Sequence, residues 1–254
     1  MISVIIVGSG NVAQNLFHAL QQTIGVNIKQ VLGRNKTHLQ FVKNDKLVNT
    51  DFTKIPTADI YILAISDDAT EIVAEHFKNK EGLVVHTSGA TPVEVLSSLK
   101  RPGIFYPLQT FTKGKIVSFN NIPICIEAND DKDVKLLYKL GNTLSKTVVE
   151  IDSDQRKTLH VAAVFVNNFT NYLYTLGAEI CEEHQIDFNL LKPLITETAA
   201  KLEDLSPLQA QTGPAKRGDQ KTLHNHLQIL KDKHQRELYT LLSNAIKEKH
   251  GKEL

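Results

Sequence analysis

Two glycines near the start of the chain have the spacing of a phosphate-binding loop. Residues 8–13 read G-S-G-N-V-A, between an apolar, β-branched run at Ile2–Val7 and a segment whose apolar residues recur at helical spacing. In such a loop the first glycine permits a tight turn, the second lets the backbone approach a pyrophosphate, and the helix N–H groups face the phosphates. A glycine turn without a ligand is the alternative. We predict a dinucleotide-binding loop formed by Gly8, Ser9, Gly10, Asn11 and Val12.

The residues after the second expected strand, Val26–Leu32, indicate which dinucleotide would bind. NAD-binding loops place an Asp or Glu there to hold the ribose 2′-hydroxyl. This chain has Gly33, Arg34 and Asn35 instead. A guanidinium suits a 2′-phosphate, so the sequence favours NADP(H) over NAD. The alternative is that Arg34 is only a solvated turn residue.

Further candidates follow the next two buried strands, expected at 60–65 and Leu83–His86. The carboxyl ends of parallel strands line the ligand crevice of a doubly wound sheet. Residues at these ends are therefore expected to contact the cofactor, and they are Ala64, Ile65, Ser66, Thr87 and Gly89.

Four polar side chains, at the end of the strand Leu83–His86 and at the end of the next one, are candidates for contact with a substrate. His86 could donate a proton, and Ser88 could hold a substrate oxygen. The alternative is local structure, with Thr87 or Ser88 capping a helix and His86 satisfying the backbone. Tyr106 and Gln109 follow the next strand end and either line the site or are structural.

A polar stripe on a long apolar helix, expected from Asp152 to about residue 183, suggests a second side of the site. His160, Asn167 and Asn171 are seven and four residues apart, which puts them on one face of an α-helix with Asn168 beside them. An unpaired buried amide costs about 1–3 kcal/mol, so these groups need a partner. That partner is either a ligand or a neighbouring helix.

The segment 206–219 is rich in turn residues between two expected helices. Arg217 offers a two-pronged contact for a carboxylate, and the candidates for substrate contact here are Thr212, Gly213, Arg217 and Asp219. A solvated linker is the alternative. Neither the two cysteines of the chain nor His224 and His226, which follow this segment, have metal-ligand spacing, so no metal site is predicted.

Strands and helices alternate up to residue 151, and only helices are expected afterwards. The fold class is therefore α/β: a Rossmann domain with a doubly wound parallel sheet at 1–151, followed by an all-α domain at 152–254. Other expected strands lie at 103–106, 122–127 and 147–151, and other helices at 69–78, 92–99, 132–140, 189–205, 220–231 and 235–249. A helix that is apolar nearly all round, as at 160–169, is expected in a core or a subunit interface.

Composition excludes several classes of partner. The formal net charge is +1 over 254 residues, so no nucleic-acid or anionic-membrane partner is expected. No apolar run has membrane-spanning length. Cys125 and Cys181 lie apart in apolar surroundings, and the N-terminus begins directly with a strand, which together predict a cytoplasmic protein with reduced cysteines.

Several segments together resemble a known group of proteins. They are GSGNVA at 8–13, HTSGA at 86–90, YPLQTF at 106–111, HVAAVFVNNF at 160–169, and AQTGPAKRGD at 210–219 followed by Thr222 and His226. The chain resembles Rossmann-like NADP-binding proteins whose helical C-terminal half is a domain of unknown function. It also looks related to pyrroline-5-carboxylate reductases, deazaflavin-dependent NADP reductases and the wider β-hydroxyacid dehydrogenase architecture. The resemblance implies a helical domain like that of 6-phosphogluconate dehydrogenase, a homodimer formed through the C-terminal helices, and a 211–219 loop near the nicotinamide.

One departure from this resemblance bears on catalysis. β-Hydroxyacid dehydrogenases carry a lysine on the long helix, followed four residues later by asparagine, whereas here His160 stands nearest the lysine's place and position 164 is Val. His160 is therefore the better candidate for a general acid, with Asn167 beside it. The expected function is NADP-dependent hydride transfer to or from a small carbonyl or imine. The alternatives are an NADP-binding sensor without turnover and a deazaflavin–NADP hydride exchanger.

Overall fold

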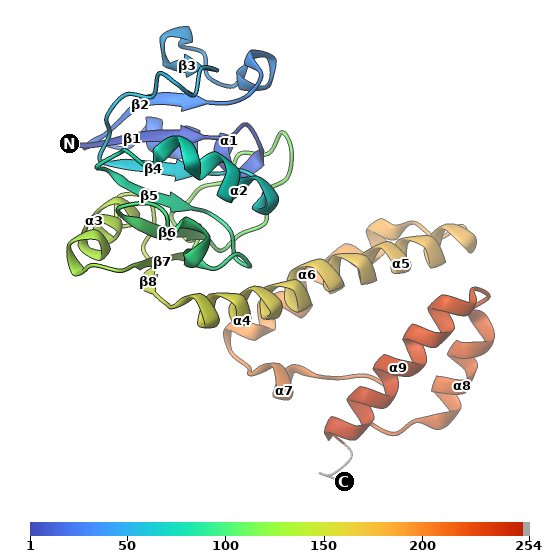
Figure 1. Cartoon of the computed structure of the whole chain (residues 1–254). Helices are drawn as coiled ribbons and strands as arrows, with labels where there is room; N and C mark the ends of the chain where they lie inside the picture. Colours follow the sequence, from blue (N-terminus) through green and yellow to red (C-terminus); the bar gives the residue numbers. More distant parts are fainter. Residues whose placement is uncertain (251–254) are drawn as a thin grey trace. The chain divides into compact units, whose positions relative to one another are not determined.

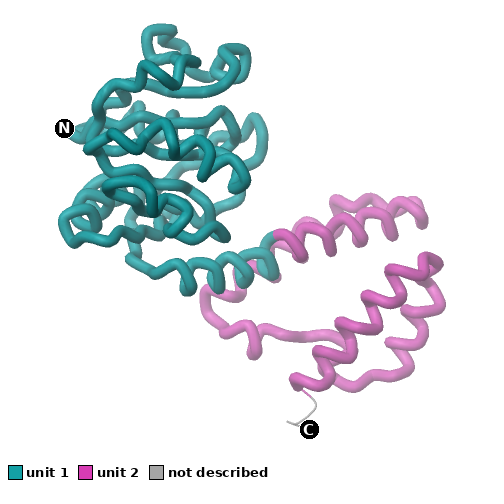
Figure 2. Tube along the Cα trace, in the orientation of Figure 1, with its two compact units in different colours: residues 1–167 teal, residues 168–254 magenta. Residues whose placement is uncertain are grey.

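The computed structural model describes residues 1–250, which form two compact units. The first unit spans Met1–Asn167 and the second begins at Asn168 (Figure 2). The division falls inside a helical run, so the domain boundary expected at residue 151 stays a prediction.

One eight-stranded sheet organises the first unit (Figure 1). The strand order is β3-β2-β1-β4-β5-β6-β7-β8, and the order reverses between β1 and β4, as in a Rossmann sheet. The bounds are β1 Ile2–Val7, β2 Val26–Leu32, β3 Val48–Asn49, β4 Ile60–Leu63, β5 Leu83–His86, β6 Pro102–Pro107, β7 Ile124–Ala128 and β8 Val148–Glu150.

Helices cover both faces of the sheet, which confirms the doubly wound fold. Successive residues of β1 point to opposite faces. Val4 and Ile6 pack in one cluster with α1 (Asn11–Gln21) and α3 (Asp131–Gly141), whereas Ile5 and Val7 pack in another with α2 (Asp67–Ala74). Because both faces are buried, the central strands can be apolar throughout, which is the pattern that the sequence shows at β1 and β4.

The sheet is not wholly parallel, in contrast to the expectation from sequence. β7 pairs antiparallel with β6, with Tyr106 opposite Cys125, and β8 then pairs parallel with β7. No α-helix lies between β6 and β7. A parallel connection needs a crossover, usually helical, whereas a direct return places the next strand antiparallel.

The chain is helical without a break from Ser153 to Glu183. It forms α4 (Ser153–Ala163), a π-helical segment (Val164–Phe169) and α5 (Thr170–Glu183). The sequence predicted the helix but not the π segment. Val161 and Val166 are 57% and 75% exposed in the single chain, so this part of the helix is not in its core, and the subunit interface stays a prediction.

The other helices differ in length from their sequence patterns: those expected at 189–205 and 220–231 are shorter, whereas those expected at 132–140 and 235–249 are longer. The second unit contains α6 (Lys192–Ala200), α7 (Pro207–Ala210), α8 (Gln220–Ile229) and α9 (Lys233–His250), with 3₁₀ turns at Phe188–Leu191 and Lys201–Glu203. In the first unit, the helix expected at 92–99 is a 3₁₀ turn at Val93–Leu96. The two-residue strand β3 was not predicted.

Candidate functional site

The predicted phosphate loop joins the carboxyl ends of three neighbouring strands. The Gly8 N–H donates to Leu32 O at the end of β2, and Ala64 N–H after β4 donates to Val7 O. Gly8 has φ +130°, and a Cβ built on it would lie 2.1 Å from Ala64 O. Only glycine fits here, because both the backbone conformation and the close approach exclude a side chain.

The start of α1 leaves its first N–H groups open to an anion. Gly10 is the N-cap, no side chain caps the helix, and its first turn holds no acidic residue. A Cβ built on Gly10 would meet no atom within 4 Å, so there is open space in front of this turn. These features fit the pyrophosphate of a dinucleotide.

Two asparagines tie a long loop to α1. Asn11 Nδ2 donates to Phe111 O at 2.8 Å, and Asn15 Nδ2 donates to Lys115 O at 3.3 Å, while Val117 N–H donates to Asn15 Oδ1. The Asn11 side chain therefore binds protein backbone, whereas the backbone N–H of Asn11 remains among the open N–H groups at the start of α1.

The residues after β2 and β4 lie at the same edge of the sheet. Gly33 is buried against Leu39, Arg34 is exposed, and Asn35 accepts from Thr37 N–H to cap a 3₁₀ turn. Within residues 1–250, the Arg34 guanidinium has no hydrogen bond or ion pair, which leaves it available to a phosphate. After β4, Ala64 is buried, Ile65 is half-buried, and Ser66 caps α2 without a side-chain hydrogen bond.

His86 is held by backbone at both ring nitrogens. Ser88 N–H donates to Nδ1 at 3.2 Å, and Nε2 lies 3.3 Å from Pro92 O, so Nε2 carries the proton. Burial lowers the pKa of His86 to about 4, and Pro92 O opposes this only in part. Ser88 Oγ accepts from Ala90 and Thr91 N–H groups. The contacts of His86 are those of its structural alternative, whereas Ser88 bonds a turn and not a helix start, since the next helical turn has Pro92 as its N-cap. The catalytic roles of both residues stay predictions.

His160 meets two of the predicted residues at the ends of β5 and β6. Its Nδ1 lies 3.3 Å from Tyr106 Oη, with the two rings in a T-shaped arrangement. A Cβ built on Gly89 would lie 2.5 Å from the same Nδ1. The half-buried imidazole therefore sits against the loop that was expected to contact the cofactor. Thr87 is half-buried in that loop, and Gln109 is exposed beyond β6.

A buried ionic network, which the sequence analysis missed, fixes α4 in place. Arg156 is fully buried, pairs with Glu127 of β7, and donates to Thr91 O at 2.7 Å. Ser153 Oγ donates to the Glu127 carboxylate and accepts from Val93 N–H. His160 follows Arg156 by one helical turn, so this network places its ring. Arg156 lies between Gln155 and Lys157 in a polar stretch, so no pattern in the sequence marked it as buried.

The π-helical segment alters the face that the asparagines share with His160. A π-helix bonds residue i to i+5, so a spacing of seven across it no longer returns to the same face as in an α-helix. Asn167, Asn168 and Asn171 are all exposed. Asn168 and Asn171 lie in the second unit, and their substrate contacts stay predictions.

The 211–219 segment is an internally bonded turn rather than an open linker. Asp219 caps α8 by accepting from Thr222 N–H and Oγ1, and these bonds lower the pKa of its carboxyl. Gly213 and Gly218 both have positive φ values. Thr212 and Arg217 are exposed. The proposed contact of these residues with a substrate stays a prediction.

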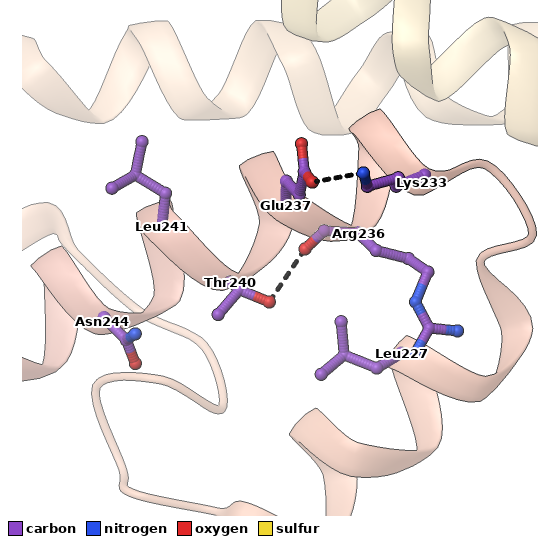
Figure 3. A pocket seen from close by; sticks show the side chains of 7 residues that line it. All are labelled: Leu227, Lys233, Arg236, Glu237, Thr240, Leu241 and Asn244. Atoms are coloured by element: carbon purple, nitrogen blue, oxygen red, sulfur yellow. Dashed lines mark hydrogen bonds and ion pairs between the residues drawn. The ribbon is translucent and has the colours of Figure 1, made fainter.

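A pocket of about 470 Å³ lies on the second unit, and none of the predicted site residues lines it (Figure 3). It is lined by Leu227 of α8 and by Lys233, Arg236, Glu237, Thr240, Leu241 and Asn244 of α9. An ion pair joins Lys233 to Glu237. Over residues 1–250, no cluster of metal-ligating side chains occurs, and no helix has the length and hydropathy needed to cross a bilayer.

Comparison with known proteins places the chain in a family. Residues 122–246 match the family described as "Domain of unknown function (DUF2520)". A solved structure named "putative NADP oxidoreductase" from Bacteroides fragilis is 39% identical, with a TM-score of 0.88, over 97% of this chain and 98% of that one. The chain belongs to the same family as the Bacteroides fragilis protein. The comparison with curated proteins gave no match.

More distant structures share the fold of this family. A reductive aminase from Aspergillus terreus in complex with NADPH and ethyl levulinate is 14% identical, with a TM-score of 0.68, over 99% of this chain and 95% of that one. A Plasmodium falciparum pyrroline carboxylate reductase with NADP bound is 13% identical, with a TM-score of 0.57, over 97% and 98%. These likenesses confirm the fold that the sequence resemblance implied.

Proposed function

We propose that this protein is an NADP-dependent oxidoreductase that moves a hydride between the nicotinamide and a small carbonyl or imine substrate. One observation carries the proposal: the imidazole of His160 lies against Gly89, at the sheet edge that also holds the phosphate loop. A dinucleotide site and a titratable proton donor are thereby within one unit of the chain. The Bacteroides fragilis relative, named for NADP oxidoreduction, supports the same cofactor.

Each part of the cofactor has a matching group on this chain. The open N–H groups of α1 would hold the pyrophosphate, and Arg34 would hold the 2′-phosphate. Residues 64–66 and 87–89 would lie beside the ribose and nicotinamide. When bound, the nicotinamide supplies the hydride. The protein then has to orient the substrate and place a proton on its oxygen or nitrogen, which is the role proposed for His160, with Asn167 as a second candidate.

Cofactor binding and turnover are tested separately. Thermal stability is measured during titration with NADPH and with NADH, and Arg34→Gln is expected to weaken binding of NADPH but not NADH. Absence of binding by either dinucleotide would refute the cofactor proposal. NADPH oxidation is then screened against keto acids, aldehydes and imines, with deazaflavin as a separate arm.

The catalytic role is tested by variants at two positions. His160→Gln and Asn167→Ala are expected to lower turnover while leaving the affinity for NADPH unchanged, because a positioned general acid contributes about 10²–10⁴-fold. Unchanged turnover in both variants would sink the catalytic assignment. NADPH binding without oxidation of any substrate class would support the sensor alternative.

We further propose that the protein is a homodimer formed through its C-terminal helices. Over residues 168–250, the buried apolar side chains are limited to Cys181, Ala210, Ala215 and Leu230. Many large apolar side chains of the same region are exposed, among them Leu173, Ile186, Leu190, Leu194, Leu202, Leu205, Leu208, Ile229 and Leu241. An exposed apolar surface on this scale marks an interface, and a second copy of the chain is the proposed occupant.

The dimer proposal is tested by mass in solution. Light scattering on the eluted protein is expected to give twice the chain mass, and Leu194→Glu, at a 62% exposed position, is expected to reduce the dimer. Ile24→Glu is the matched control, because Ile24 is 97% exposed in the first unit. A monomeric wild type would refute the proposal.

We propose a cytoplasmic location on the basis of the thiols. Both cysteines are free and buried, as is usual in a reducing compartment. Cell fractionation tests this, and recovery from an oxidising compartment would contradict it.

A further inference from the structure

The Tyr106 hydroxyl faces one ring nitrogen of His160. Oη and Nδ1 are 3.3 Å apart, and the ring centroids are 6.3 Å apart at an interplanar angle of 67°. Tyr106 is 8% exposed at the end of β6, whereas His160 is half-buried on α4. The contact therefore joins a buried phenol to a partly exposed ring.

The direction of this hydrogen bond follows from the surroundings of the phenol. Burial raises the pKa of Tyr106, with Arg156 opposing the shift in part, so the hydroxyl keeps its proton at neutral pH. A buried hydroxyl that donates to nothing is costly, and over residues 1–250 its hydrogen-bond partner is Nδ1 of His160. The Tyr106 hydroxyl therefore donates, and a neutral His160 carries its own proton on Nε2.

Gly89 closes the space beside the same nitrogen. A Cβ at this position would lie 2.5 Å from Nδ1 and 2.8 Å from Tyr106 Oη. Since Tyr106 and Gly89 both lie on the Nδ1 side of the imidazole, the Nε2 edge is the one that a substrate can reach.

We infer that Tyr106 is a positioning residue that, by bonding Nδ1 of His160, turns the Nε2 edge of the ring toward the substrate. The hydroxyl donates to Nδ1 of the neutral ring and accepts from Nδ1–H of the protonated ring. The substrate receives the Nε2 proton of the protonated ring, which leaves a neutral ring with its proton on Nδ1, still bonded to Tyr106. This inference rests on the proposed function for its role in catalysis. The hydrogen bond and the tautomer can be measured without any substrate.

Nitrogen NMR of histidine-labelled protein tests the arrangement directly. The His160 signals are assigned by their loss in His160→Gln. In the wild type, Nε2 is expected to be the protonated nitrogen and Nδ1 a hydrogen-bonded acceptor. In Tyr106→Phe, the Nδ1 resonance is expected to move to the position of an acceptor without a hydrogen bond. A proton on Nδ1 in the wild type, or an unchanged Nδ1 resonance in the variant, would overturn the inference.

The chain offers a matched control for this substitution. Tyr239 Oη lies 2.8 Å from His226 Nδ1, and the rings are again T-shaped, at 5.8 Å. Tyr239→Phe removes the same type of bond elsewhere, so it is expected to shift the signals of His226 and leave those of His160 unchanged. Movement of the His160 signals in this control would overturn the reading of the Tyr106→Phe result.

Kinetics separate a positioning role from a structural one. If Tyr106 acts through His160, the double variant Tyr106→Phe/His160→Gln turns over no more slowly than His160→Gln alone. Additive losses would refute the positioning role. Absence of any NADPH-dependent turnover would refute the proposed function instead, while the NMR result still decides the arrangement of Tyr106 and His160.

Discussion

Replacing His86 with Gln should remove one component of the acid sensitivity of the first unit. His86 is 1% exposed, and burial is the main cause of its low pKa. In the unfolded chain the same imidazole titrates near 6.5. The unfolded chain therefore binds a proton that the folded one excludes, and folding loses free energy as the pH falls below 6.5.

The size of the effect follows from the two pKa values. Above pH 6.5, His86 is neutral in both the folded and the unfolded chain, and its contribution to the unfolding free energy is fully present. This contribution is lost as the pH falls toward about 4. With 1.36 kcal/mol per pH unit for one proton, the wild type should lose about 2 kcal/mol of unfolding free energy between pH 7 and pH 5 through this group. Gln cannot take up the proton, so the variant should lack this component even if it is less stable at pH 7.

Urea unfolding followed by far-ultraviolet circular dichroism at both pH values measures the effect. The decisive quantity is the difference between the two proteins in how much unfolding free energy each loses, because other groups titrate equally in both. Protein concentration is kept constant, since association also shifts stability. Parallel losses in wild type and variant would refute the assignment of a neutral, buried His86.

Three other substitutions probe the packing around the site. Glu127→Gln should destabilise the fold by about 3–5 kcal/mol, because it leaves the buried Arg156 charge uncompensated; urea midpoints measure this, and a change below about 1 kcal/mol would contradict it. Gly89→Ala should cost about 1–3 kcal/mol by overpacking and displace the His160 ring, seen as shifted ring resonances; unchanged resonances would contradict the close approach. Asn15→Ala should cost about 0.5–1.5 kcal/mol, because Lys115 O and Val117 N–H lose their side-chain partner, and proteolysis should increase in the loop that it holds; an unchanged cleavage rate would contradict that tie.

The phosphate loop and the main strands were predictable because their signals are local. Gly8 has the backbone conformation and the close approach that only glycine tolerates, and its position between a buried strand and a helix was visible in the sequence. The fold class follows from the same periodicity. The antiparallel β7 was not predictable in this way, because strand direction depends on whether the connection crosses over the sheet and not on the residues of the strand.

The contacts of His160 were only partly predictable. Its candidacy came from its place on a polar stripe of an apolar helix, but the bond to Tyr106 joins residues 54 apart in sequence. The burial of Arg156 could not be predicted, since an isolated arginine is usually solvated. The π segment was invisible because no local rule of residue type specifies it, and the shared face expected for His160 and the asparagines depended on regular α-helical spacing.

The Arg156 network also bears on whether the sheet could fold without helix α4. A fragment that ended at residue 151 would contain all eight strands and the phosphate loop, yet it would lack Ser153, Arg156 and His160. The Glu127 carboxylate and the Tyr106 hydroxyl would then lose the partners that they have in the whole chain. Helix α4 thus completes the polar interior of the sheet unit, and a truncated nucleotide-binding fragment would need it in order to be self-sufficient.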